Sequence, residues 1–408
     1  MFWSDFSRNK WAVIVLSVGV LLSVGFYAVT PGAQDSRAAT ECAGGARNDA
    51  ERVDCWLQIV FERLRNDGIA SAYETFGRLY DSYPLFGASG CHQHAHKVGD
   101  TAYYELFVAA GRRDIEGMDF PQSATSCGYG FFHGFIEHLI QDHPSPAYVT
   151  TACEYLRGKY SGTMRDIGTI CYHASGHGFT LAQVDTLPKT EWGKLPGFIA
   201  RPLAQCEDLP FAKEREVEDC REGVFNVIAD WMTGNEYGLR FDYEHPFDTC
   251  ADTPIRAAYA CYYELGQKLE PVIKDNPLVA ERLVAPIEDK GLRETAFGVM
   301  VAGMMQRKVP LGEEKKILDS CLKIGDQALF RVCILSLANG MMEHGSPGKE
   351  YQRVLFVCSD SRLEERGIGG FCYDTLALRL SRFYAPEKKL RICGLFPADR
   401  TESCVATP

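Results

Sequence analysis

The segment Cys91-His92-Gln93-His94-Ala95-His96-Lys97-Val98-Gly99-Asp100 carries a pattern that recurs twice further along the chain. The later copies are Cys127-Gly128-Tyr129-Gly130-Phe131-Phe132-His133 and Cys171-Tyr172-His173-Ala174-Ser175-Gly176-His177, each with a cysteine followed closely by histidine and glycine. Residues four apart share one face of an α-helix, so three helices would carry the pairs His92/His96, His133/Glu137 and His173/His177. The pattern therefore predicts a cluster of five imidazoles and one carboxylate.

The same cysteines reveal a longer repeat. Repeat cysteines fall at positions 55, 91, 127, 171, 220, 261, 333 and 372, and most steps between them are 36 to 49 residues. The step from Cys261 to Cys333 is about twice as long and contains one copy without cysteine. In this copy Gly303-Met304-Met305 matches Gly340-Met341-Met342, and Ala296 stands at the position of the cysteine. A period of this length is typical of helix-turn-helix repeats. We predict an all-α, α-solenoid-like array of helical hairpins stapled by disulfides, with an irregular α-bundle as the alternative.

The number and spacing of the cysteines indicate an oxidising compartment. The chain has sixteen cysteines and no C-x-x-C motif, which argues against a zinc ribbon, a thioredoxin-like site and covalently attached haem. Regular couples in an exported chain predict local disulfides. The predicted pairs are Cys42–Cys55, Cys91–Cys127, Cys153–Cys171, Cys206–Cys220, Cys250–Cys261, Cys321–Cys333, Cys358–Cys372 and Cys393–Cys404.

The N-terminus predicts attachment to a membrane. Residues 11–29 carry no charge, and nineteen residues at about 1.5 Å each cross roughly 30 Å of hydrocarbon. Arg8 and Lys10 precede this stretch, so we predict a cytoplasmic tail at 1–10, a transmembrane signal anchor at 11–29 and a linker at 30–45. A cleaved signal peptide is the alternative. In either case the bulk of the chain is extracytoplasmic, in the periplasm or outside the cell.

The histidines divide the rest of the chain into two parts. Eight of the ten lie between positions 92 and 177, and only His245 and His344 lie outside this region. We therefore distinguish His-rich helical repeats at 46–200 from His-poor repeats at 201–408. His133 and His177 occupy the same position, six residues after the cysteine, in two copies of the repeat, and the other copies have other residues at this position. The fold therefore does not demand histidine there. This comparison favours a functional role for the cluster.

The residue types in the cluster predict a metal site. His92, His96, His133, His173 and His177 supply imidazole nitrogens, and paired histidines four apart on a helix are a frequent transition-metal motif. Nitrogen and oxygen ligands without thiolate suit zinc, copper or iron, and five histidines allow one or two ions. Glu137 and Asp100, one turn after His133 and His96, are the candidate general bases for a metal-activated water. A hydrolase and an oxidase are both compatible with this set.

Other classes of function remain open or are excluded by composition. The net charge of -11 and the absence of a basic stripe argue against a nucleic-acid partner. A non-catalytic scaffold that binds a protein or peptide on a concave helical surface is the main alternative to the metalloprotein. Haem held non-covalently by two histidines is a third hypothesis.

The glycines beside the histidines predict either tight helix crossings or a substrate channel.

Overall fold

The computed structural model describes residues 31–46, 48–164, 166–184, 186–251, 253–306 and 314–407. These ranges form α-helices with short 3-10 and π segments, and no strand occurs within them. Pro146, Pro277 and Pro386 each stand at the start of a helix, where the missing amide hydrogen costs no hydrogen bond. The prediction of an all-α protein is therefore confirmed.

The helices fall into two sets. The first set, which we call the core helices, consists of α5 (Cys91–Ala102), α6 (Gly130–Asp142), α8 (Ile167–Val184), α10 (Glu214–Gly234), α12 (Ala258–Gln267), α15 (Lys290–Gly303), α17 (Gln327–His344) and α20 (Gly369–Phe383). The others are α2 (Pro31–Gly45), α3 (Asp49–Ser82), α4 (Pro84–Ala88), α7 (Pro146–Tyr160), α9 (Leu195–Glu207), α11 (Asp248–Ala251), α13 (Glu270–Ile273), α14 (Pro277–Val284), α16 (Glu314–Cys321), α18 (Tyr351–Cys358), α19 (Ser361–Glu365), α21 (Pro386–Cys393) and α22 (Ala398–Ala406). Short segments are η1 (Tyr103–Val108), η2 (Gln122–Thr125), η3 (Lys189–Glu191), η4 (Glu236–Gly238), η5 (Ile255–Ala257) and η6 (Met304–Gln306).

The chain divides into two compact units, with the boundary between Ile59 and Val60. The described part of the first unit contains α2 and the start of α3, joined by the disulfide between Cys42 and Cys55. Most of the segment predicted as a linker at 30–45 is the helix α2. Alanine, glutamine, arginine and glutamate between its glycines are good helix formers, and the indole of the buried Trp56 donates to the Ala39 carbonyl at 3.0 Å.

No helix in the described ranges is long and apolar enough to cross a bilayer. The predicted tail at 1–10 and the predicted transmembrane anchor at 11–29 lie outside the described residues. Both stay predictions.

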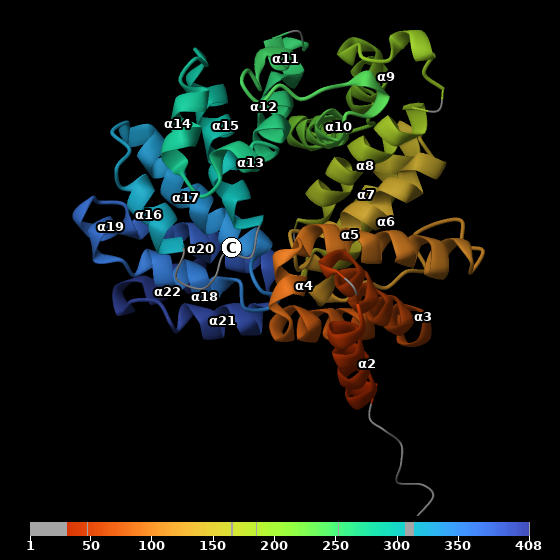
Figure 1. Cartoon of the computed structure of the whole chain (residues 1–408), viewed down its shortest axis with the longest axis horizontal. Helices are drawn as coiled ribbons and strands as arrows, with labels where there is room; N and C mark the ends of the chain where they lie inside the picture. The colour runs from red at the N-terminus through yellow and green to blue at the C-terminus, as the bar shows by residue number, and fades with distance from the viewer. Residues whose placement is uncertain are drawn as a thin grey trace, which may run out of the picture. The chain divides into compact units, whose positions relative to one another are not determined.

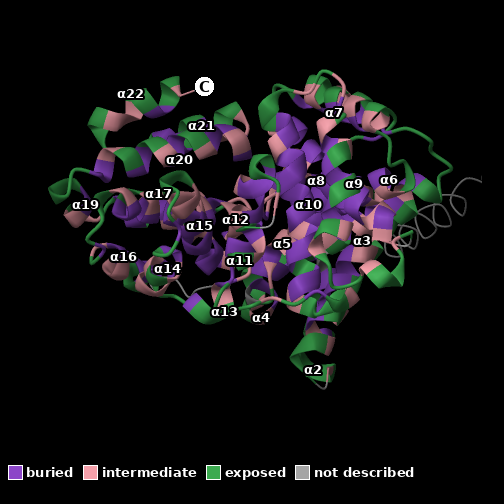
Figure 2. Ribbon diagram, turned by 90° about the horizontal axis from the view of Figure 1, so that it is seen from above, coloured by how far each residue is buried: buried purple, intermediate pink, exposed green. Residues whose placement is uncertain are grey.

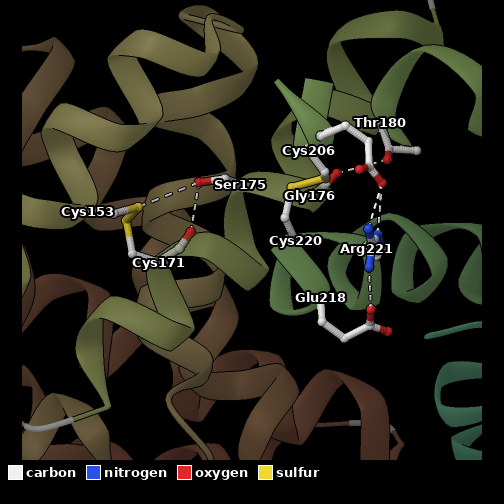
Figure 3. The surroundings of a disulfide bond; sticks show 10 residues. Cys153, Cys171, Ser175, Gly176, Thr180, Cys206, Glu218, Cys220 and Arg221 are labelled. Atoms are coloured by element: carbon white, nitrogen blue, oxygen red, sulfur yellow. Dashed lines mark hydrogen bonds and ion pairs between the residues drawn. A yellow bond between two sulfur atoms is a disulfide. The ribbon is translucent and has the colours of Figure 1, made fainter. Parts of the chain in front are cut away.

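All eight predicted disulfides are present, and no cysteine is free. Most of them tie a core helix to the helix before it, as Cys153–Cys171 ties α7 to α8 and Cys206–Cys220 ties α9 to α10 (Figure 3). Cys42–Cys55 and Cys393–Cys404 instead join the pairs α2/α3 and α21/α22, and Cys91–Cys127 joins the start of α5 to the segment just before α6. So many disulfides indicate an oxidising environment outside the cytoplasm.

The core helices of the second unit pack in the order in which they occur in the sequence. Each one contacts the next, from α5 through α6, α8, α10, α12, α15 and α17 to α20 (Figure 1). Their residues are largely buried, most visibly in α8 and α10 (Figure 2). The copy without cysteine is real, since Met304, Met305, Met341 and Met342 occupy equivalent buried positions after α15 and in α17.

Glycines allow the core helices to touch along their backbones. A Cβ atom on Gly99 would lie 2.0 Å from the carbonyl oxygen of Phe131, and one on Gly134 would lie 2.3 Å from that of His96. Gly178 faces the Glu137 carbonyl in the same way, at 2.7 Å. Of the two roles predicted for these glycines, tight helix crossing is the one that the structure shows. These crossings bring α5, α6 and α8 close enough for their histidines to meet.

The array of the second unit closes on itself. The Tyr129 hydroxyl of the α6 N-cap donates to the Arg382 carbonyl of α20 at 2.9 Å, and the Tyr80 hydroxyl of α3 donates to the His344 carbonyl at 3.4 Å. An ion pair joins Lys349 to Asp81 at 2.7 Å. Contacts between the first and last repeats were not predicted from the sequence. They join the first repeats of this unit to the last ones.

Candidate metal centre

Three consecutive core helices bring the predicted ligands together. His92 and His96 come from α5, His133 and Glu137 from α6, and His173 and His177 from α8, as the sequence pattern predicts. The imidazoles form a row, because the ring of His133 lies 4.9 Å from the rings of both His92 and His173. The ring of His177 lies 4.9 Å from that of His173. The five imidazoles therefore share one region but do not surround one point.

One group of three ligand atoms has the spacing of a metal site. His96, Glu137 and His177, which we call the triad, each offer an atom within 4.8 Å of the other two. Glu137 Oε2 lies 3.2 Å from His96 Nε2 and 3.0 Å from His177 Nδ1. These separations approach the roughly 3.4 Å expected between ligand atoms of a tetrahedral ion with bonds of about 2.1 Å. Glu137 and His177 are buried and His96 is half-buried.

Carboxylates surround His96 on both sides. Its Nδ1 lies 3.2 Å from Asp100 Oδ1, while its Nε2 faces Glu137. Burial lowers the pKa of His96, but hydrogen bonds to Asp100 and Glu137 outweigh it and raise this pKa to about 10. Burial likewise opposes ionisation of Glu137, yet hydrogen bonds from His177 and His96 hold its pKa below the usual range. Without metal, the pair is therefore an imidazolium and a carboxylate.

His92 and His133 form a neutral pair beside the triad. Burial lowers the pKa of His92 to about 3 and that of His133 well below its usual value. His92 Nδ1 donates to the Cys127 carbonyl at 3.0 Å, so its Nε2 accepts from His133 Nδ1 at 3.2 Å. His133 Nε2 then carries a lone pair, and this buried atom has no hydrogen-bond partner. Neither residue belongs to a group of three ligands in the described ranges.

His173 faces a different set of ligands. Its Nε2 lies 3.2 Å from His177 Nε2, and its Nδ1 lies 4.0 Å from Glu222 Oε2 on α10. His173, Glu222 and Glu264 of α12 form a second group with ligand atoms within 4.8 Å, which we call the second cluster. Burial raises the pKa of Glu222 well above its usual value and that of Glu264 to about 8. The sequence pattern gave no role to Glu264.

Two further histidines were underestimated from the sequence. His138 lies 3.6 Å from Asp100 and forms a third possible ligand group with Asp100 and Glu137. His344, from the His-poor part, is half-buried, and its charge would lower the pKa of His92, because the closure of the array brings α17 near α5. Its repeat carries no histidine pair, so the local spacing of histidines could not reveal that His344 lies near His92. His245, by contrast, is exposed.

A cavity of about 570 Å³ is lined by His344, but by none of the five predicted ligand histidines. It lies among the core helices from α10 to α20, and most of its lining side chains are polar. The lining comprises Arg215, Tyr259, Tyr263, Gln267, Gly291, Glu294, Thr295, Gly298, Val299, Ala302, Gly303, Gln306, Val332, Ser336, Asn339, Glu343, His344 and Arg379. Cavities of this size fit small molecules. Arg215 and His344 connect it electrostatically to His173 and His92, respectively.

Fold and site together define a disulfide-rich, all-α protein with histidine and glutamate groups that can hold a metal ion. Comparison with protein-family models, curated proteins and solved structures finds no match. The chemistry of the site therefore has to be argued from its own geometry.

Proposed function

We propose that the protein is an extracytoplasmic metal-binding protein in which His96, Glu137 and His177 hold one transition-metal ion. The observation that supports this most is the spacing of their ligand atoms, within 4.8 Å of one another although they come from three helices. The predicted role of His92 and His133 as ligands is not part of this proposal, since they pair with each other instead.

The donor set of the triad suits zinc, iron or copper. Two imidazoles and one carboxylate form the ligand set of many catalytic zinc sites and of non-haem iron sites, and such a set leaves a position for water or substrate. Copper also binds nitrogen ligands strongly. When bound, zinc would supply an activated water for hydrolysis, and iron would supply redox chemistry. We therefore keep both reaction classes within the proposal.

The protein's own groups prepare the ligands for the ion. His96 can keep its proton on Nδ1, where Asp100 accepts it, and present Nε2 to the metal. His177 must transfer its proton from Nδ1 to Nε2, which then donates to His173 Nε2 across the existing 3.2 Å contact. In this arrangement Glu137 is a ligand and Asp100 orients a ligand, which replaces the general-base roles predicted from the sequence.

Elemental analysis of the full-length protein tests the proposal. The protein is produced in an oxidising compartment without a polyhistidine tag and compared with the variants His96→Ala and His177→Ala. We expect the wild type to retain zinc, iron or copper and each variant to lose the triad's ion. His245→Ala, which removes an exposed imidazole, is the matched control and should retain metal. Wild-type protein without bound metal after reconstitution would refute the proposal.

The cavity favours a second, non-catalytic candidate function. Its volume of about 570 Å³ and its hydroxyl, amide and charged lining fit a small polar molecule better than the protein or peptide partner predicted from the sequence. Arg379, which contacts Asn339 at 2.8 Å and Glu343 at 3.0 Å, holds part of this lining in place. A thermal-shift screen of small polar molecules tests the idea, because binding should stabilise the wild type and not Arg379→Ala.

Membrane attachment through residues 11–29 also stays part of the proposal. Its support is the uncharged stretch in the sequence. Fractionation with an alkaline wash should leave the protein in the membrane pellet. A mature N-terminus close to Pro31 would instead indicate a cleaved signal peptide.

A further inference from the structure

The second cluster has features that its own hydrogen bonds do not explain. It joins His173 of α8, Glu222 of α10 and Glu264 of α12, whose ligand atoms lie within 4.8 Å of one another. Glu264 is 0% exposed and Glu222 is 6% exposed. The Oε1 atoms of both glutamates are buried and accept no hydrogen bond. Buried polar atoms without a hydrogen-bond partner are rare in folded proteins, so these two oxygens indicate a site for a ligand.

The surrounding side chains position these oxygens without neutralising both of them. Glu264 Oε2 accepts from Asn226 Nδ2 at 2.6 Å and from Gln267 Nε2 at 2.9 Å, which leaves Oε1 directed elsewhere. Arg215 reaches Glu222 Oε1 only at 3.5 Å, while it pairs with Asp219 at 2.8 Å. Arg215 thus forms ion pairs with two carboxylates, Asp219 and Glu222. The hydrogen bonds to Glu264 are of the kind that orient a carboxylate ligand.

We propose that His173, Glu222 and Glu264 form a second divalent-cation site, separate from the triad. One imidazole and two carboxylates without thiolate suit a divalent transition metal such as manganese, iron, cobalt or zinc. The ion can enter from the cavity, because Arg215 and Gln267 contact the glutamates and also line that space. The site does not depend on the triad for its ligands.

One hydrogen bond couples the two sites. In the metal-free protein the neutral His173 donates from Nε2 to His177 Nε2, so its Nδ1 lone pair already faces Glu222. An ion bound at the triad would occupy His177 Nδ1, so the proton of His177 would move to its Nε2. There it would face the proton on His173 Nε2. Filling both sites therefore requires this 3.2 Å contact to open. The second ion should bind more weakly than the first, by the about 5-fold to 150-fold that is typical of such coupling.

Titration of the full-length protein with Co²⁺, followed by calorimetry and visible absorption, tests the second site. We expect two ions per wild-type chain, one per chain in Glu264→Gln and in His96→Ala, and none in the double variant. Glutamine can still accept the bonds from Asn226 and Gln267, so Glu264→Gln should fold. His96→Ala should bind its remaining ion more tightly than the wild type binds its second one. Glu222→Gln serves as an independent variant of the same site.

The pattern of stoichiometries separates the two sites. If Glu264→Gln and Glu222→Gln both bind as many ions as the wild type, the second site is refuted and a proton shared between the carboxyl groups explains the cluster. If the wild type binds one ion that Glu264→Gln loses and His96→Ala keeps, the second site stands and the triad proposal fails. Glu294→Gln, which changes a carboxylate of the cavity outside the cluster, is the control and should bind two ions.

Discussion

Gly223 of α10 lies against the backbone of His173, such that a Cβ atom on Gly223 would be 1.8 Å from the His173 carbonyl oxygen. The contact is reciprocal, because a Cβ atom on Gly176 would be 2.0 Å from the Cys220 carbonyl oxygen. α8 and α10 can thus cross at backbone distance. This crossing brings Glu222 to 4.0 Å from the imidazole of His173.

The crossing predicts the effect of adding one methyl group. Gly223→Ala should force α8 and α10 apart and lower the free energy of unfolding by about 1–3 kcal/mol, since the obstructing atoms are backbone. It should also reduce Co²⁺ binding at the second cluster. Denaturant unfolding and metal titration measure the two effects.

Gly158→Ala provides the matched control for this substitution. Gly158 lies in α7, is exposed, and has no atom within 4 Å of the place that a Cβ would occupy. Alanine there should stabilise the helix by roughly 0.5–1 kcal/mol. Equal effects at both positions would contradict the packing role of Gly223.

The elements that could be predicted from the sequence are those fixed by short-range contacts. Cysteine couples close loops of 11 to 18 residues for most pairs, so partners are near in sequence as well as in space. The spacing of four residues likewise places His173 and His177 on one face of α8 at hydrogen-bond distance. The local spacing of residues was therefore enough to predict both the disulfide pairs and this histidine pair.

The elements that were missed depend on how distant helices meet. Which imidazoles share an ion is set by the crossings of α5, α6 and α8, and these bring His96 to Glu137 but pair His92 with His133. Glu264 joins His173 only because α10 brings α8 and α12 together. No repeat periodicity encodes the closure that brings His344 near His92. The helix α2 was not expected within the predicted linker, because glycines stand near both of its ends.

His133 and His177 should differ sharply when replaced by alanine. His177→Ala removes a triad ligand and should abolish binding of the triad's ion. His133→Ala should retain that ion but lose about 1–3 kcal/mol of stability, because the half-buried His92 Nε2 then lacks its hydrogen-bond donor. Elemental analysis together with thermal unfolding distinguishes the two outcomes. Loss of metal in His133→Ala with an intact fold would restore His133 as a ligand.

The disulfides should contribute unequally to stability. Cys91–Cys127 closes 36 residues and Cys393–Cys404 closes 11, so chain entropy predicts losses of about 4 and about 3 kcal/mol when each pair is replaced by alanine. Denaturant unfolding of the two double variants checks the order. All other cysteines are paired, so neither variant leaves a free thiol. A larger loss for Cys393–Cys404 would contradict the loop-length argument.

Glu350 should make stability depend on pH at the closure of the array. It is 1% exposed, and Tyr384 donates to its Oε2, while Lys388 and Tyr80 also act on its charge. Burial raises the pKa of Glu350 from 4.5 to about 6. Between these values the folded protein binds more protons than the unfolded chain, so stability is lost as pH rises from about 4.5 to about 6.

The size of this effect follows from the shift in pKa. A difference of about 1.5 units corresponds to roughly 2 kcal/mol across this pH range. Glu350→Gln still accepts the hydrogen bond from Tyr384 but cannot ionise, so its stability relative to the wild type should rise by that amount from pH 4.5 to pH 6.5. Urea unfolding of both proteins at several pH values gives this difference directly and cancels the contributions of other groups, including Asp219 and Glu264. Parallel curves for the two proteins would show that Glu350 ionises in the folded protein as it does in the unfolded chain.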